Sequence, residues 1–205
     1  MPPIPELEEI RRKQIIDAAL LTISNKGYAK ATMAEIAQAA NMSKGGLAHY
    51  FKTKRELFQE AFTEFYRMIF ERVEREAAEI EDPLDKLLGF ESLFAADDPD
   101  VVWGYPLLFD CMSVAGRDPE YRVLFSDWVD KWVDLLSRII REGVEAGLFS
   151  PLKPEPMARA ISAVYQGIAA RWFLARKDHS RDWALESYHN AIRGLMAPYI
   201  IANHT

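Results

Sequence analysis

The sequence is poor in the residues that build disulfides, metal sites and membrane spans. It has one cysteine, Cys111, which excludes an internal disulfide. The longest uncharged apolar stretch, Val101 to Phe109, has about half the length of a bilayer-spanning helix, and Met1 to Pro5 lead into a glutamate-rich segment rather than a signal-peptide core. We therefore expect no membrane segment. We also expect no structural metal, because thiolates are too few and the four histidines show no ligand spacing: His49, His179, His189 and His204.

Catalytic motifs are missing as well. The sequence contains no Gly-x-Ser-x-Gly, no Walker or dinucleotide-binding glycine pattern and no His-Glu-x-x-His. An enzyme is therefore the least favoured class, and we expect no catalytic residue and no cofactor. What remains is a chain of 205 residues, 49% of them apolar, which is enough for one large domain or two small ones with a packed core.

Charge is distributed unevenly along the chain. The formal net charge is −6, yet residues 11–55 carry nine Lys or Arg against two Asp or Glu. From Glu56 onward, sixteen Lys or Arg face twenty-six Asp or Glu. A polyanion such as nucleic acid would bind at this basic N-terminal quarter, although a solvated charged surface accounts for the same counts.

Helix start and stop signals are frequent, and strand signals are nearly absent. Lys26 followed by Gly27 ends a first helix of roughly Pro5 to Lys26. Further breaks fall at residues 147–151 and 177–180. Two Thr-x-x-Glu capping boxes and three Asp-Pro pairs mark helix starts at Thr32, Thr53, Asp82, Asp98 and Asp118. These signals predict an all-α fold of about nine helices.

Residues 32–51, TMAEIAQAANMSKGGLAHYF, have the pattern of a helix-turn-helix. A capped helix that starts at Thr32 is followed by a tight connection through Asn41 and a second start at Ser43. Asn41 stands where a left-handed residue is needed, and asparagine is tolerated there best after glycine. The small core of this unit is predicted to consist of Ile36, Met42, Leu47 and Phe51, with Ala37 keeping the helices close.

The second helix of this pattern has residues that lower helix stability but suit insertion into a DNA groove. Paired glycines cost about 1 kcal/mol each in a helix interior, but they let the backbone approach a groove closely. Ser43 as N-cap directs amides at phosphate, and Lys44 can reach a base edge or a phosphate. The residues predict these DNA contacts: Ser43, Lys44, Gly45, Gly46, His49, Tyr50, Lys52 and Lys54.

The segment IAQAANMSKGGLAHYFKTKREL resembles the DNA-binding motif of the tetracycline-repressor (TetR/AcrR) family of bacterial regulators. The resemblance covers about residues 11–58. It implies a three-helix DNA-binding domain at residues 1–53, and a ligand-binding and dimerisation domain at 54–205 that begins with a long fourth helix from Lys54 to about Glu79. It also adds Thr32 to the phosphate contacts. Gly46 and Ala48 stand where relatives often have larger residues, and Asn41 replaces the usual glycine.

Aromatic residues of the C-terminal part predict an effector pocket, although core packing explains each ring on its own. Pro106 is expected to kink the apolar helix around residues 101–109 and leave room beside it. Asp110 needs a partner if buried, which could be Arg117, Arg171 or a cationic or hydroxylated ligand, whereas Cys111 fits a small buried residue. The candidate ligand-binding residues are Trp103, Tyr105, Phe109, Asp110, Met112, Trp128, Trp132, Tyr165 and Trp172.

The last two helices, which carry Ile161 to Trp172 and Trp183 to Tyr199, predict a homodimer interface or a face packed within the chain. The resemblance implies a repressor in the bacterial cytoplasm, associated with the nucleoid when bound. As a homodimer it would bind a palindromic operator on double-stranded DNA and be released by a small, largely apolar or aromatic effector. The alternative is a helical interaction module whose basic quarter binds acidic protein.

Overall fold

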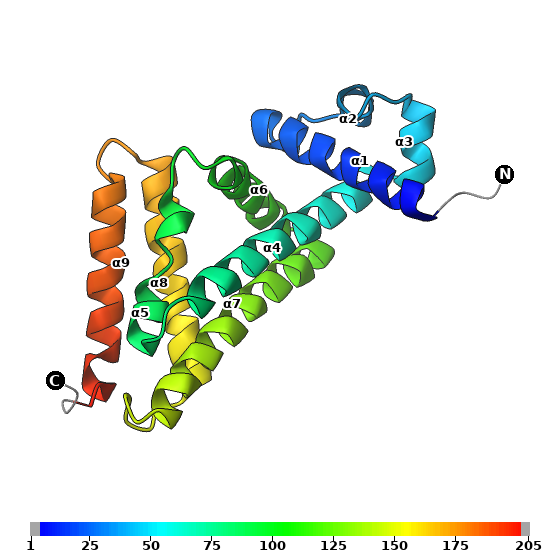
Figure 1. Cartoon of the computed structure of the whole chain (residues 1–205). Helices are drawn as coiled ribbons and strands as arrows, with labels where there is room; N and C mark the ends of the chain where they lie inside the picture. Colours follow the sequence, from blue (N-terminus) through cyan, green and yellow to red (C-terminus); the bar gives the residue numbers. More distant parts are fainter. Residues whose placement is uncertain (1–4, 202–205) are drawn as a thin grey trace. The chain divides into compact units, whose positions relative to one another are not determined.

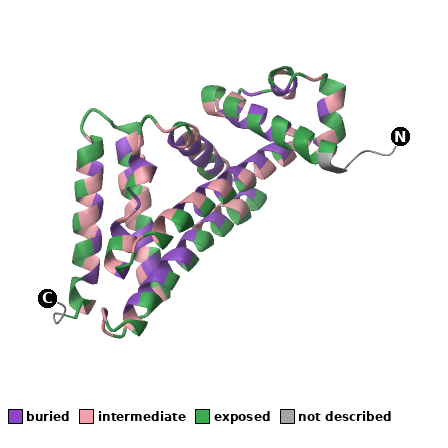
Figure 2. Cartoon of the chain, viewed as in Figure 1, coloured by how far each residue is buried: buried purple, intermediate pink, exposed green. Residues whose placement is uncertain are grey.

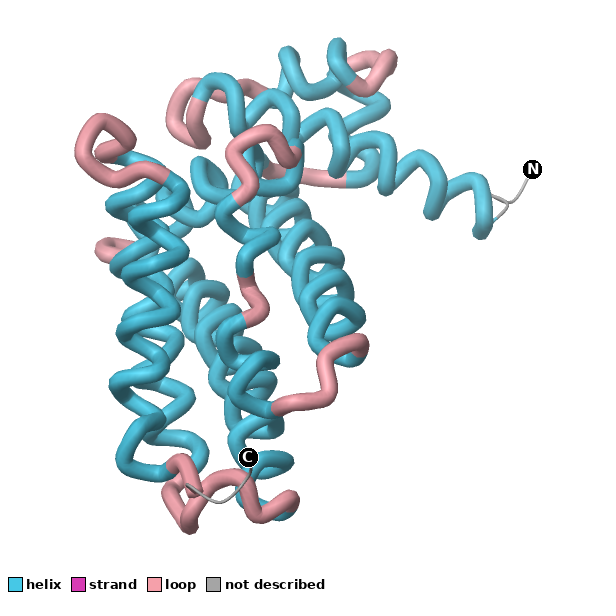
Figure 3. The backbone as a smooth tube through the Cα atoms, turned by 60° about the vertical axis from the view of Figure 1, so that its left-hand side comes forward, coloured by secondary structure: helices cyan, strands magenta, loops and turns pink. Residues whose placement is uncertain are grey.

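The computed structural model describes residues 5–201, where the elements are helices and one isolated antiparallel β-bridge joins Phe149 and Ile200 (Figures 1 and 3). The N-terminal residues 1–4, where no signal-peptide core is expected, and His204 lie outside it. Between residues 5 and 201 there are nine α-helices and two short 3-10 helices: α1 (Pro5–Lys26), α2 (Met33–Ala39), α3 (Lys44–Tyr50), α4 (Lys54–Ala78), α5 (Pro83–Leu88), η1 (Glu91–Phe94), α6 (Pro99–Ala115), α7 (Pro119–Glu145), α8 (Pro154–Leu174), α9 (Arg181–Met196) and η2 (Ala197–Tyr199). The predicted all-α fold is confirmed. None of the described helices is both long and apolar enough to cross a membrane.

Helix starts follow the predicted capping chemistry. Asp82 accepts hydrogen bonds from two amides of the first turn of α5, and Asp98 and Asp118 each accept one from the residue two positions on. Proline is the first residue of all three helices that follow. At Thr53 the capping differs from the prediction, since its hydroxyl accepts from the Glu56 amide while the Glu56 carboxylate binds the Lys52 amide.

The chain forms two compact units, and one of them contains the helix-turn-helix. Of the described residues, this unit covers those up to Ile69 together with Val102–Phe125. Its core is formed by the buried apolar side chains of α1, the first half of α4 and α6 (Figure 2). Helix α6 packs closely on α4, because a β-carbon at Gly104 would lie 2.9 Å from the Phe65 ring. The Tyr66 hydroxyl also donates to the Gly104 carbonyl at 2.9 Å.

The other unit covers Phe70–Val101 and the described residues from Ser126 onward. Its core is rich in aromatic rings from η1 and helices α7, α8 and α9. The buried Tyr188 hydroxyl donates to the Leu87 carbonyl at 2.7 Å and so ties α9 to α5. The two units do not divide the chain at residue 53, because α4, α6 and α7 each contribute residues to both. A functional boundary between 53 and 54 stays a prediction.

Candidate nucleic-acid interface

The helix-turn-helix has the local geometry that its sequence predicts. The Thr32 hydroxyl accepts from the Glu35 amide, while the Glu35 carboxylate accepts from the Thr32 amide at 3.0 Å. Asn41 is left-handed, with φ of +55°, and the Met42 amide then donates to the Ala37 carbonyl at 2.9 Å. Ser43 caps α3 by accepting from the Gly46 amide at 3.0 Å. These local bonds fix the turn between α2 and α3.

One face of α3 is buried and the other is open. Leu47 and Phe51 are fully buried together with Ile36, whereas Met42 is only half-buried. Most of the residues expected to contact DNA are exposed, namely Thr32, Ser43, Lys44, Gly45, His49 and Lys52, while Gly46, Tyr50 and Lys54 are half-buried. The structure thus presents the segment that begins at Ser43 on the outside.

Packing within the chain does not require glycine at position 45. A β-carbon at Gly45 would have Ser43 Oγ as its nearest neighbour, at 3.9 Å, which is ordinary contact. At Gly46 the same atom would be 3.3 Å away, which is tight. Within the described residues, Lys44 and Lys52 have no ion-pair partner. The exposed end of α3 therefore combines free positive charge with an accessible backbone.

Lys54 lies at the start of α4 but points into the protein. Its Nζ donates to the carbonyl oxygens of Tyr28, Ala29 and Ala31 at 2.7, 3.3 and 3.0 Å. These carbonyls belong to the turn between α1 and α2. The phosphate contact expected of Lys54 stays a prediction, and the structure gives this side chain a different set of partners.

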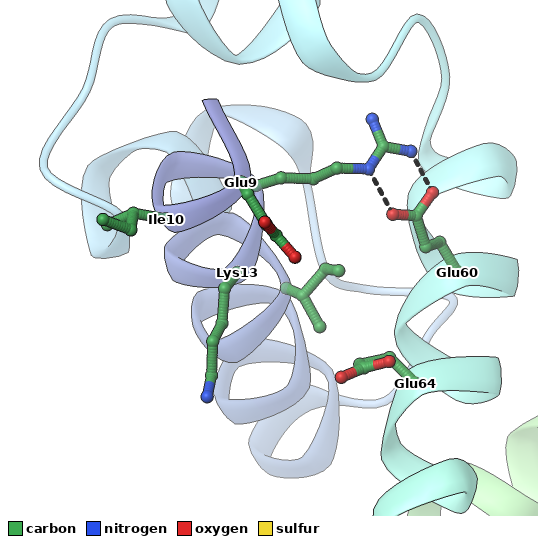
Figure 4. Close-up of a pocket in the computed structure, with 7 residues that line it drawn as sticks. Glu9, Ile10, Lys13, Glu60 and Glu64 are labelled. Atoms are coloured by element: carbon green, nitrogen blue, oxygen red, sulfur yellow. Dashed lines mark hydrogen bonds and ion pairs between the residues drawn. The ribbon is translucent and has the colours of Figure 1, made fainter. Parts of the chain in front are cut away.

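Several other cations of the basic quarter are paired within the same unit. Arg12 makes a bidentate ion pair with Glu60, and its guanidinium lies 4.6 Å from the centroid of the Phe51 ring. Both residues belong to the lining of a groove of about 490 Å³ between α1 and α4, and Figure 4 marks the hydrogen bonds of Glu60 with dashed lines. The lining residues are Glu9, Ile10, Arg12, Lys13, Ile16, Glu60 and Glu64. Lys26 pairs with Glu35, and Arg55 with Asp118 and Glu120. Counting charges along the sequence did not show these pairs, since Glu60, Asp118 and Glu120 lie far along the chain and only Glu35 lies near its partner.

The candidate ligand-binding residues of the helix-turn-helix unit lie on α6. The rings of Tyr105 and Phe109 are 6.1 Å apart, Trp103 is half-buried and Met112 is exposed. The helix continues through Pro106. Asp110 accepts a hydrogen bond from the Tyr28 amide at 2.7 Å, so its partner is neither Arg117 nor Arg171.

In the other unit, four candidate residues belong to an aromatic core. Trp128, Trp132 and Trp172 are buried, and the Trp132 ring lies 5.7 Å from that of Tyr165. Phe94 of η1 lies 5.5 Å from both Tyr165 and Trp172. Sequence reasoning missed Phe90, Phe94 and Tyr188 as members of this cluster, and only their aromatic character could have indicated them. We call Phe90, Phe94, Trp132, Tyr165, Trp172 and Tyr188 the aromatic cluster.

The expected interface helices are partly committed to packing within the chain. Ala169 on α8 and Tyr188 and Ile192 on α9 are buried inside their own unit. Gly167 on α8 and Gly194 on α9 are exposed, and a β-carbon at either position would meet no atom of the described residues within 4 Å. These glycines leave open positions on the two helices.

Comparison with known proteins places this geometry in a family. The pattern described as bacterial regulatory proteins, tetR family, matches residues 15–61, and the BetI-type transcriptional repressor C-terminal pattern matches residues 89–197. The BetI regulator of Burkholderia thailandensis is 28% identical over 196 residues, which are 94% of this chain and 96% of that protein. The BetI regulator of Paraburkholderia xenovorans is 40% identical over 82 residues, which are 40% of this chain and 42% of that protein.

Solved structures show the same fold at low identity. A TetR-family regulator from Cytophaga hutchinsonii superposes with a TM-score of 0.81 at 20% identity, over 94% of this chain and 96% of that one. A transcriptional regulator from Saccharomonospora viridis, solved in complex with choline, gives 0.80 at 20% identity, over 93% and 97%. Because the C-terminal pattern alone covers more than half of its residues, this chain belongs to the tetR family of bacterial transcriptional regulators and has a BetI-type C-terminal domain.

Proposed function

We propose that this regulator is a repressor that binds a palindromic operator as a homodimer and leaves it when a small effector binds. The observation that carries the proposal is the exposed face of α3, where Lys44, Gly45 and His49 reach solvent above a fully buried Leu47. Membership of the tetR family supports DNA binding. Because the target is chromosomal DNA, we place the protein in the bacterial cytoplasm.

The small size of α3, the helix that would read the operator, favours a dimer. Helix α3 has seven residues, which offer too few base and phosphate contacts for tight specific binding by one copy. Two copies related by a two-fold axis would read two half-sites of a palindrome. The open positions at Gly167 and Gly194 support α8 and α9 as the contact, since glycine inside a helix costs about 1 kcal/mol relative to alanine and no neighbour among residues 5–201 requires it.

The effector class that we propose is a small cation with an apolar surface, such as choline. The BetI-type C-terminal pattern and the choline complex of the Saccharomonospora viridis regulator support this class. Aromatic ring faces attract quaternary ammonium groups, and the aromatic cluster concentrates such rings in one core. The buried Trp132 Nε1 has no acceptor among the described residues, so it is free to donate to the hydroxyl oxygen of such a ligand.

Release from DNA requires that the effector bind two arrangements of the dimer with different affinities. The dimer has one arrangement that fits the operator and one that does not. The effector must bind the second arrangement more tightly, because a ligand with equal affinity for both does not change their populations. Helix α4 has 25 residues in one run and so is about 38 Å long at 1.5 Å per residue. We propose that it transmits the effector-induced shift to the two α3 helices of the dimer and changes the distance between them.

DNA binding is tested with fragments selected from the host genome. The purified protein should enrich fragments that share a palindrome, and its affinity for them should fall steeply as salt rises. Lys44→Ala should weaken operator binding roughly tenfold, because one charged contact in a groove is lost. Lys177→Ala, at an exposed position after α8, serves as control and should bind as the wild type does. Equal affinity for random and selected duplexes, or none for either, would instead favour the interaction module.

The effector class is tested by calorimetric titration with choline. Trp132→Phe keeps a ring but removes the N–H donor, and we expect it to weaken choline binding roughly fivefold, as the loss of one hydrogen bond does. Trp183→Phe on α9, outside the aromatic cluster, should leave choline binding unchanged. If the wild type does not bind choline at millimolar concentration, the effector belongs to another class.

A further inference from the structure

The turn between α1 and α2, residues 27–31, is held by a lysine from another helix. Lys54 Nζ donates to the carbonyl oxygens of Tyr28, Ala29 and Ala31. An ammonium group has three N–H donors, so these carbonyls use its full capacity. The same Nζ lies 4.6 Å from the centroid of the Tyr28 ring, a cation–π distance. The positive charge of Lys54 is therefore directed into the protein.

An aspartate from α6 binds a backbone amide N–H of the same turn. The Asp110 carboxylate accepts from the Tyr28 amide at 2.7 Å. Gly27, with φ of +80°, brings the backbone close, since a β-carbon there would lie 3.9 Å from Asp110 Oδ2. Burial raises the pKa of Asp110, while the Tyr28 amide and the charge of Lys54 act to lower that pKa. Both the N–H and the C=O groups of the turn thus have charged partners.

The Tyr28 side chain adds two more contacts within this unit. The Tyr121 hydroxyl of α7 donates to the Tyr28 hydroxyl at 2.9 Å. The Tyr28 ring lies 4.6 Å from the Phe58 ring of α4, in an edge-to-face arrangement. Three helices, α4, α6 and α7, therefore hold one tyrosine of the turn.

This turn leads directly into the helix-turn-helix. Ala31, whose carbonyl binds Lys54, is followed by Thr32, the N-cap of α2. The local bonds around Asn41 then fix α3 to α2. A rotation of the turn is consequently passed to α3, because the bonds at Ala31, Thr32 and Met42 connect the turn to α2 and α2 to α3.

We propose that Lys54 and Asp110 are positioning residues for operator binding, which together hold the α1–α2 turn and so set the orientation of α3 without touching DNA. This pair, which we call the turn latch, also connects α6 to the helix-turn-helix. The inference rests on the proposed operator binding. It assigns Lys54 a role other than the phosphate contact that the family resemblance implies.

The salt dependence of DNA affinity distinguishes the two roles. A lysine that contacts phosphate contributes about one unit to the slope of log affinity against log salt, whereas a positioning lysine contributes none. Lys44→Met and Lys54→Met make the same chemical change at two positions. On the selected operator, we expect Lys44→Met to lose about one unit of slope. Lys54→Met should bind roughly tenfold more weakly with the slope of the wild type.

The link between the two latch residues is tested by a double-mutant cycle. Asp110→Ala removes the acceptor for the Tyr28 amide, and Asp110→Asn keeps one. We expect Asp110→Ala to weaken operator binding as Lys54→Met does, and Asp110→Asn to stay within about twofold of the wild type. Because both residues hold one turn, the double variant should be less impaired than the sum of the single effects in free energy.

Hydrogen exchange of the wild type provides a measurement that does not depend on how the variants fold. The Tyr28 amide should exchange as slowly as amides of the helix interiors, because a carboxylate accepts it. Exchange at the rate of an open loop would overturn the latch. A loss of slope in Lys54→Met, or wild-type affinity in both Lys54→Met and Asp110→Ala, would overturn it too. Failure of the wild type to bind any selected operator is a separate result, which refutes the proposed function.

Discussion

Burial at the level of single residues decides which polar groups can react. Cys111 on α6 is fully buried, and burial raises the pKa of its thiol to about 12. Since the thiolate is the reactive form, we predict that Ellman's reagent labels the native protein very slowly at pH 8. Labelling in denaturing urea should be complete within minutes. Rapid labelling of the native protein would mean that α6 opens far more readily than its packing indicates.

Residue roles that depend on near neighbours could be predicted from the sequence, and roles that depend on distant partners could not. The left-handed Asn41 and the capping hydroxyl of Thr32 need only the next few residues. The partner of Arg12 lies on another helix and the partners of Lys54 and Asp110 lie in the turn between α1 and α2, between 23 and 82 positions away. The exposed part of the candidate DNA interface was therefore anticipated, while the ion pairs and the turn latch were not.

Among the helices, too, features set by near neighbours could be predicted and features set by distant contacts could not. The bounds of α1 and the starts of α5, α6 and α7 agree with the prediction, because caps and proline act within one turn. The short helix η1 was not predicted. It is too short for a periodic pattern, and its Phe94 joins the aromatic cluster only through tertiary packing. The composition of the C-terminal core thus depended on contacts that no local signal shows.

The chain reversal after α7 gives a prediction for a single glycine. A β-carbon at Gly143 would overlap two atoms of the Phe149 ring, and the amides of Leu148 and Phe149 donate to the Gly143 carbonyl at 2.9 and 3.0 Å. Alanine normally stabilises a helix interior, but here the ring must move. We predict that Gly143→Ala lowers the free energy of unfolding in urea by about 1–3 kcal/mol, as overpacking does.

A second variant separates this clash from other effects of the added methyl group. Phe149→Leu removes the ring that the new β-carbon would meet. In the Phe149→Leu background, Gly143→Ala should cost less than it does alone, because the two changes share one contact. Additive costs would show that Gly143 is needed for another reason.

For the whole molecule, compact units and functional domains follow different boundaries. Helix α4 belongs to the helix-turn-helix unit up to Ile69 and to the other unit from Phe70. Capping signals place the start of α4 at Lys54, but no local signal shows where along a continuous helix its packing partners change. The family comparison supports a DNA-binding part and a C-terminal part, and the structure adds that three helices are shared between the two compact units.

The assembly offers the last prediction. Gly167 faces open space on α8, so Gly167→Leu should leave the fold of the single chain intact. In a two-fold dimer the added side chain meets the partner helix twice, which should shift the protein to monomers in sedimentation at micromolar concentration. Operator affinity should then fall roughly a hundredfold or more, because a monomer reads one half-site. Arg141→Leu adds the same side chain to an exposed position of α7 and should remain dimeric. A Gly167→Leu dimer with wild-type affinity would place the interface elsewhere than on this face of α8.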